Sequence, residues 1–152
     1  MHADKTRLLP FARPSRRQRS SKGPATFDLL GFTHYWRRSR AGNWVPALKT
    51  RTARLGRSKK AVTDWCRCHR HLPVVEQHAA LTRRIEGHFN YFGVNGNGRS
   101  LLALLHHARG AWHKWLGRRS QRGRMSWARF QALLRVYPLP APTIRVQLWA
   151  AP

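Results

Sequence analysis

Carboxylates are the side chains that most often hold catalytic metal ions, and this chain has few of them. Its 152 residues include five acids, and the nearest two, Glu76 and Glu86, lie ten positions apart. A two-metal polymerase or nuclease holds its ions with clustered carboxylates. The spacing argues against a self-contained enzyme of that kind, so we expect no catalytic residue, no metal ligand and no cofactor in this chain.

A second group with metal-ligand chemistry is the run Cys66-x-Cys68-His69-x-His71. Thiolates and imidazoles bind Zn²⁺, but structural zinc sites usually pair such a group with a second, distant one. Residues two apart on a helix also point to different faces. We therefore favour a buried Cys66, with Cys68, His69 and His71 at a helix end. Two cysteines without a secretory signal indicate a reducing interior.

Histidine and asparagine are also the residue types of HNH nuclease sites, and this chain has them at His88, Asn90, His106 and His107. That chemistry needs a general-base histidine beside a metal ion that is held by histidine and usually by an acid. Here the four residues lie on helical stripes with one acid, Glu86, nearby. Structural roles are favoured, and a nuclease is kept as an alternative.

Positive charge dominates the composition, with 30 Lys and Arg against 5 Asp and Glu and a formal net charge of +25. Of the basic residues 24 are Arg, whose planar guanidinium binds phosphate with two hydrogen bonds and stacks on bases. Because 41% of the residues are hydrophobic, this charge must lie on a folded body. The composition predicts a polyanionic partner, above all nucleic acid, and a membrane surface fits less well.

The N-terminal third predicts β-structure around a basic loop at residues 12–25. Residues 6–11 fit a short strand, and residues 26–36 fit a strand with a bulge or bend at Gly31. A hairpin turn is expected at residues 40–43, with Trp36 and Trp44 facing each other across it as a cross-strand pair, and stacking of these rings on bases is left open.

From about residue 51 the apolar spacing becomes helical, and three or four helices are expected. The second begins at Pro73, residues 93–98 (GVNGNG) close it, and Ser126 caps the fourth. The expected inward positions are Leu55, Val62, Trp65, Cys66 and His69; Val75, His78, Leu81, Ile85, Phe89 and Phe92; Leu101, Leu105, Ala108, Trp112, Trp115 and Leu116; and Trp127, Phe130, Leu134 and Tyr137.

The predicted fold is therefore α+β and mainly α, a small β-hairpin followed by a bundle of three to four helices. The longest purely apolar runs are about five residues, too short for a signal-peptide core or a membrane span. We expect a cytoplasmic protein.

Three local patterns together resemble group II intron-encoded reverse transcriptases with maturase activity. The first is residues 4–6 (DKT) followed by residues 26–32 (TFDLLGF), and the most specific is residues 65–97, with GHFNYFG at 87–93. The third is residues 126–130 (SWARF) with residues 137–140 (YPLP). Together they span nearly the whole chain.

The resemblance implies three parts. Residues 1–49 would be the C-terminal edge of the reverse transcriptase palm, residues 50–120 the maturase-specific thumb or X domain, and residues 121–152 its last helix and Pro-rich tail. The catalytic Tyr-Ala-Asp-Asp motif of the family is missing from this sequence. The chain thus resembles the downstream part of a longer enzyme, which would need Mg²⁺, and no polymerase activity is expected of it alone.

The resemblance and the charge pattern together nominate binding residues. The primer-grip-like residues are Phe27, Leu29, Leu30, Gly31 and Phe32. The candidates for RNA contact are Arg51, Arg54, Arg57, Lys59, Lys60, Arg83, Arg84, His88, Asn90, Tyr91, Arg118, Arg119, Arg122 and Arg124. For the stretch that begins at Gly87, a packing role in which this glycine lets two helices approach closely is equally open.

The implied function is binding of structured intron RNA to assist splicing and mobility, in a bacterial cytoplasm and associated with the nucleoid or a ribonucleoprotein. A DNA/RNA duplex and an upstream reverse transcriptase chain are further partners that the resemblance implies, and no membrane is expected. The alternatives are an active RNA-directed DNA polymerase, an HNH-type nuclease, or a non-functional truncated relic of a mobile element.

Overall fold

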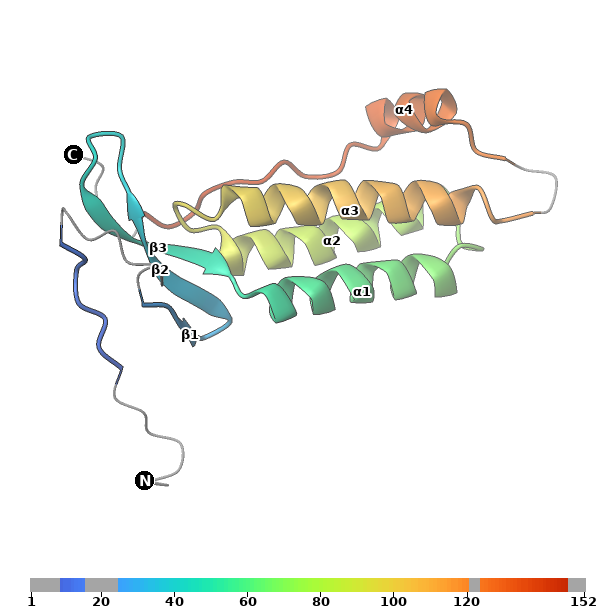
Figure 1. Ribbon diagram of the computed structural model, residues 1–152. Coiled ribbons are helices and arrows are strands. Elements are labelled where there is room, and N and C mark those ends of the chain that lie inside the picture. The colour runs from blue at the N-terminus through green and yellow to red at the C-terminus, as the bar shows by residue number, and fades with distance from the viewer. Residues whose placement is uncertain (1–8, 16–24, 121–123, 148–152) are drawn as a thin grey trace, which may run out of the picture. The chain divides into compact units, whose positions relative to one another are not determined.

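The computed structural model describes residues 9–15, 25–120 and 124–147, and Figure 1 shows their elements. The chain forms two compact units, Met1–Arg51 and Thr52–Pro152. The first contains a three-stranded antiparallel sheet, and the described part of the second contains four helices. The predicted α+β class, with a small sheet preceding the helices, is confirmed.

The sheet consists of β1 (Phe27–Leu29), β2 (Phe32–Arg38) and β3 (Trp44–Thr50), in the order β1-β2-β3. A two-residue turn, Leu30-Gly31, joins β1 to β2, and both residues have positive φ, 50° and 82°. Two-residue hairpin turns of type I′ require positive φ at both central positions. The expected bulge at Gly31 within one strand is thus wrong, because two successive left-handed residues reverse the chain.

The predicted turn between β2 and β3 is confirmed, but the predicted tryptophan pair is wrong. In the turn, the Gly42 amide donates to the Ser39 carbonyl at 3.0 Å. The strand register pairs Trp36 with Pro46 and Arg38 with Trp44. The turn is centred one residue later than a tryptophan pair requires, so Trp44 instead contacts the Arg38 guanidinium, 4.8 Å from its ring centre.

Phe11 completes the apolar side of this unit. Its ring stacks on Trp36 with centroids 5.1 Å apart and meets Phe27 edge-on at 4.9 Å. Residues 9–11 are not in a strand, and residues 6–8 of the expected strand lie outside the described residues, as do residues 16–24 of the basic loop.

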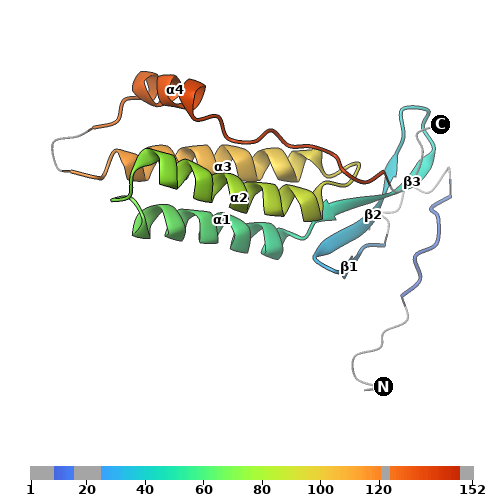
Figure 2. The same ribbon diagram turned by 180° about the vertical axis from the view of Figure 1, so that it is seen from behind.

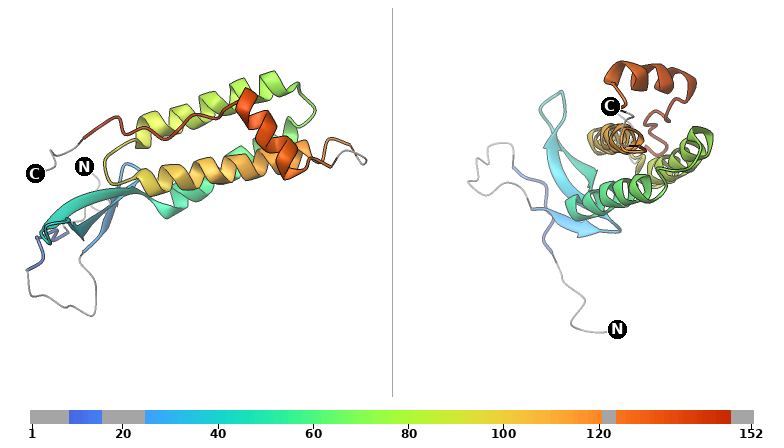
Figure 3. Two further views of the ribbon diagram at one scale, coloured as in Figure 1. Left: turned by 90° about the horizontal axis from the view of Figure 1, so that it is seen from above. Right: turned by 90° about the vertical axis from the view of Figure 1, so that its right-hand side faces the viewer.

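The second unit consists of α1 (Thr52–Cys68), α2 (Val74–Phe92), α3 (Gly98–Leu116) and α4 (Trp127–Val136). The three long helices lie side by side, and α4 crosses over α2 and α3 (Figures 2 and 3). The expected boundaries hold: Pro73 precedes α2, and the Ser126 side chain accepts a hydrogen bond from the Arg129 amide at 3.3 Å. In the described ranges, every helix is too short or too polar to cross a bilayer.

The predicted helical stripes supply most of the core, with two exceptions. Val75 is 58% exposed, and Gln77 is buried in its place. The Gln77 amide oxygen accepts from the Trp112 indole at 2.9 Å, and its nitrogen donates to the carbonyls of Arg70 and Leu72. Because all of these polar groups are satisfied, glutamine is tolerated inside.

The second exception is Trp127, an expected core anchor that is 54% exposed. Its neighbour Phe130 is fully buried against Trp112, with ring centroids 5.8 Å apart. Trp127 stacks on the outer side of this pair, parallel to Phe130 at 5.4 Å. Phe130 therefore anchors α4 in the core, and Trp127 covers the outer side of the Phe130 ring.

Two histidines fix the ends of α4. The His113 Nε2 donates to the Met125 carbonyl and the His78 Nε2 donates to the Pro138 carbonyl, both at 2.9 Å. These two carbonyls flank the helix on either side in the sequence, so α4 is tied to α3 at its start and to α2 at its end.

The segment after α4 is fixed at the loop between α2 and α3. The Gly93 carbonyl accepts from the amides of Arg145 and Val146, at 2.6 and 3.0 Å, and the Asn95 amide donates to the Val146 carbonyl at 3.1 Å. A side chain at Gly93 would collide with the carbonyl oxygens of Phe89 and Thr143, the latter only 2.7 Å from the added carbon. Glycine is therefore required there for close approach.

We predict that Gly93→Ala lowers the free energy of unfolding by about 1–3 kcal/mol, because two backbone oxygens must move to accommodate the methyl group. Gly110→Ala is the matched control, since an added carbon at Gly110 meets nothing within 4 Å. That exchange in the middle of α3 should raise stability by about 0.5–1 kcal/mol. Thermal and denaturant unfolding measure both, and equal effects of the two variants would contradict the packing described.

Candidate functional site

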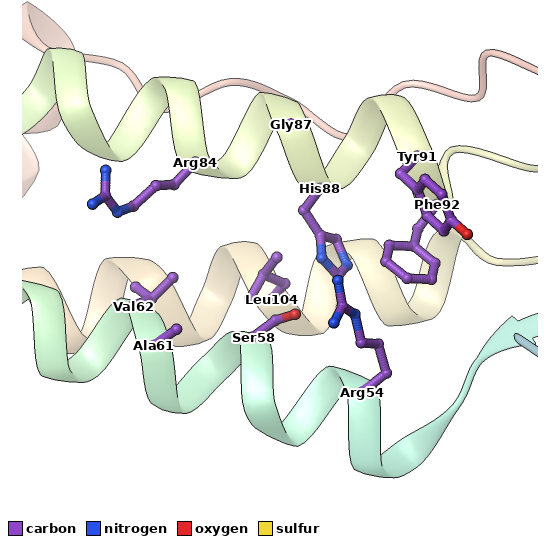
Figure 4. A pocket seen from close by; sticks show the side chains of 10 residues that line it. All are labelled: Arg54, Ser58, Ala61, Val62, Arg84, Gly87, His88, Tyr91, Phe92 and Leu104. Atoms are coloured by element: carbon purple, nitrogen blue, oxygen red, sulfur yellow. The ribbon is translucent and has the colours of Figure 1, made fainter. Parts of the chain in front are cut away.

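A cleft of about 440 Å³ opens between α1 and α2, with α3 behind it (Figure 4). We call it the α1–α2 cleft. Its lining residues are Arg54, Ser58, Ala61 and Val62 from α1; Arg84, Gly87, His88, Tyr91 and Phe92 from α2; and Leu104 from α3.

Helical spacing brings the polar lining residues to one place. Arg54 and Ser58 are four residues apart on α1, and Arg84 and His88 are four apart on α2, so each pair shares one face of its helix. The apolar side chains of Val62, Phe92 and Leu104 are buried beneath them. The result is a polar rim from two helices above an apolar floor.

The two arginines of the cleft are not neutralised by any carboxylate of the described residues. The Arg84 guanidinium lies over the Trp65 ring, 4.9 Å from its centre, and Arg54 reaches towards the His88 ring (Figure 4). None of the carboxylates in the described part of the chain lines the cleft. The ion pairs of the described residues are elsewhere: Arg51 with Asp28, and Lys60 and Arg67 with Asp64. Two unneutralised guanidinium groups on one rim suit a phosphate or another anion.

His88 adds a neutral polar group between these cations. Burial, and secondarily the charge of Arg54, lowers the pKa of His88 to about 4. Its Nε2 is buried and has no hydrogen-bond partner within the described part of the chain. The ring packs against Phe92 with centroids 4.5 Å apart. The hydrogen-bonding capacity of this Nε2 is therefore unused among the described residues.

Gly87 leaves the cleft open instead of drawing helices together. An added carbon at this position would meet no atom within 4 Å. The packing role considered for this glycine is therefore wrong.

Four of the sequence-predicted RNA-binding residues meet in this cleft: Arg54, Arg84, His88 and Tyr91. Five others on the same helices are not part of its lining. Arg57, Arg83 and Asn90 are exposed, Lys60 pairs with Asp64 at 2.6 Å, and the Lys59 carbonyl accepts from the His107 Nε2 at 3.1 Å.

The remaining candidates lie apart from it. Arg51 belongs to the first unit, where it pairs with Asp28 at 2.9 Å. Arg118, Arg119 and Arg124 follow α3, and Arg122 lies outside the described residues.

The primer-grip-like residues also lie in the first unit, on the β1–β2 hairpin. Phe27 stacks on His34, with rings nearly parallel and 4.5 Å apart. Leu29 and Leu30 are exposed at the turn, and Gly31 and Phe32 complete the reversal into β2.

The other metal-ligand and nuclease candidates have structural surroundings. Cys66 is buried, which raises the pKa of its thiol to about 12, whereas Cys68 is exposed. The His107 Nε2 contacts the Thr63 hydroxyl at 2.8 Å and the Lys59 carbonyl, which links α3 to α1. Among residues 9–15, 25–120 and 124–147, no group of three or more His, Cys, Asp or Glu is placed to hold a metal ion.

Sequence reasoning missed Ser58 as part of the site and Trp65 as the support of Arg84. Ser58 lies one helical turn after Arg54, a spacing that could have identified it. Trp65 was expected only as a core residue, and its contact with Arg84 joins residues 19 positions apart on different helices.

Comparison of the chain with protein-family models, curated proteins and solved structures gives no match. A functional assignment therefore rests on the geometry of the cleft and on the motifs quoted above.

We predict that His88 titrates near pH 4, measured by NMR of its ring. An unfolded chain binds this proton near pH 6.5 and the folded chain only near pH 4, so stability should decrease as the pH falls through that window. His88→Gln should remove part of this pH dependence. Arg54→Gln should raise the pKa slightly, because burial is the larger cause. A midpoint at or above 6.5 would contradict the buried, cation-flanked environment.

Proposed function

We propose that this chain binds structured RNA through its backbone phosphates and that the α1–α2 cleft is one of the contact sites. The observation that carries the proposal is the presence of two guanidinium groups, Arg54 and Arg84, in the lining of one cleft to which the described residues contribute no carboxylate. Each can donate two parallel hydrogen bonds to phosphate oxygens. With a net charge of +25, binding a polyanion releases many counterions, which favours the complex.

RNA is preferred to DNA on two grounds. The deep major groove of A-form RNA is too narrow for side chains, so proteins recognise its phosphates and shape, which suits rigid helices that present arginines. The motifs at residues 65–97 and 126–140 resemble those of group II intron maturases. The proposed role is therefore that of the C-terminal part of such a maturase, which binds intron RNA to assist splicing and mobility.

The proposal includes the partners that the resemblance implies. An upstream reverse transcriptase chain and a DNA/RNA duplex are the further partners, and a ribonucleoprotein in a bacterial cytoplasm is the proposed setting. Polymerisation is assigned to the upstream chain. Nucleotide incorporation or strand cleavage by the purified protein alone, with Mg²⁺ or Mn²⁺, would contradict this division of labour.

Substitution in the cleft tests the proposal. Arg54→Gln and Arg84→Gln should each weaken binding of a structured RNA about tenfold, because each removes a charge-assisted hydrogen bond to phosphate. Fluorescence anisotropy at one fixed salt concentration measures the affinity, and thermal unfolding confirms that the variants fold.

The matched controls are Arg57→Gln and Arg83→Gln, exposed arginines on the same two helices that do not line the cleft. Each control removes the same charge as a cleft variant. Because Arg57 and Arg83 lie outside the cleft, each control should weaken RNA binding less than about threefold. If all four variants lose affinity equally, binding depends on total charge and not on this cleft. If the wild-type chain binds no RNA, the proposed function itself is wrong.

A further inference from the structure

A second concentration of positive charge lies at the C-terminal end of α3. Three cations surround the ring of Trp115, with Arg118, Lys114 and Arg70 at 5.3, 5.6 and 5.9 Å from its centre. They come from the loop between α1 and α2, from the last turn of α3 and from the segment after it. One indole ring therefore gathers three like charges from different parts of the second unit.

A cleft of about 270 Å³ continues this positive surface. Its lining residues are Leu116, Arg119, Ser120, Arg124, Met125 and Arg129, so three more arginines meet there without a carboxylate. Arg119 connects the two groups, because its guanidinium donates to the carbonyls of Arg70 and Leu72. We call these residues together the distal cluster: Arg70, Lys114, Arg118, Arg119, Arg124 and Arg129.

Local structure explains only part of this accumulation. A helix C-terminus attracts cations, which accounts for Lys114 and Arg118 at the end of α3. Arg70 comes from another loop, Arg124 from the segment before α4, and Arg129 from the first turn of α4. None of the six pairs with Asp28, Asp64, Glu76 or Glu86, the carboxylates of the described residues. No carboxylate of the described residues offsets their mutual repulsion, and a bound anion would reduce it further than water does.

We propose that the distal cluster is a second phosphate-binding site for RNA, so that one chain holds two RNA segments at once. The inference rests on the proposed RNA-binding function and adds a second site to it. Along α3, Leu104 in the floor of the α1–α2 cleft and Trp115, whose ring three cations of the distal cluster surround, are eleven residues apart, about 16 Å of helix. One phosphate group cannot bridge that distance, so the two sites take different phosphates.

Bivalence gives the test a clear readout. An RNA with two hairpins joined by a flexible linker should bind the wild-type chain at least about tenfold more tightly than a single hairpin, because the second contact is intramolecular. A variant that lacks one site loses this advantage. It still binds the single hairpin through the other site.

The distal variant is Arg118→Gln/Arg124→Gln/Arg129→Gln, which spares Arg70 and Arg119 because the bonds of Arg119 to the α1–α2 loop support the fold. The cleft variant is Arg54→Gln/Arg84→Gln. The control is Arg83→Gln/Arg99→Gln/Arg135→Gln, which removes three exposed charges outside both sites. If the distal triple variant melts early, Arg124→Gln alone replaces it.

The expected result is that the advantage of the two-hairpin RNA falls to about twofold, the statistical factor, in both site variants and persists in the control. If the distal variant keeps the full advantage, the second site is overturned while RNA binding through the cleft stands. If the wild-type chain binds neither the single-hairpin nor the two-hairpin RNA, the proposed RNA-binding function itself is wrong.

Two further arms identify the source of the phosphate. Inorganic phosphate at millimolar concentration should not abolish the two-hairpin advantage, and its doing so would assign the cluster to a free anion. Anionic phospholipid vesicles should bind the distal variant and the control variant alike, because both lack three positive charges. If the distal variant binds vesicles more weakly than the control variant does but keeps its affinity for RNA, the cluster is a membrane contact and the proposal is overturned.

Discussion

Repulsion among like charges is the constraint under which this chain folds. Thirty basic residues face five acids, so carboxylates can neutralise only a small part of the positive charge. In the described residues, Asp28 and Asp64 pair with three cations in total. Most of the remaining arginines and lysines are exposed, where water screens them.

Aromatic rings take the place that acids hold in other proteins. Arg38 lies over Trp44, Lys49 over Tyr35 and Arg84 over Trp65, in addition to the three cations at Trp115. An aromatic face attracts and orients a cation but leaves its net charge in place. Guanidinium groups held in this way remain able to bind phosphate. The same contacts that help the charged surface to fold therefore prepare it for a polyanion.

The sequence predicted the features that depend on local chemistry. Helical periodicity, Pro73 before α2 and the Ser126 cap of α4 all involve residues within one or two turns of each other. The β2–β3 turn was also predicted, but the expected pairing of Trp36 with Trp44 requires a turn centred one residue earlier than the observed register.

Features that depend on distant residues could not be predicted. The burial of Gln77 requires the Trp112 indole, 35 positions later, to satisfy its amide. The lining of the α1–α2 cleft includes Arg54 and Arg84 from different helices, and the distal cluster joins residues from α3, from α4 and from two connecting segments. Periodicity indicates which face of a helix is buried. It does not indicate which polar faces meet.

The claim that arginines in two clefts bind RNA phosphates is tested most directly by the salt dependence of binding. Each phosphate contact adds roughly 0.7–0.9 to the negative slope of log K against log salt concentration. The account predicts a steep negative slope for the wild-type chain that becomes shallower by about 2 when Arg54 and Arg84 are replaced together by glutamine. A wild-type slope near zero would contradict it, as would a slope unchanged by that double substitution.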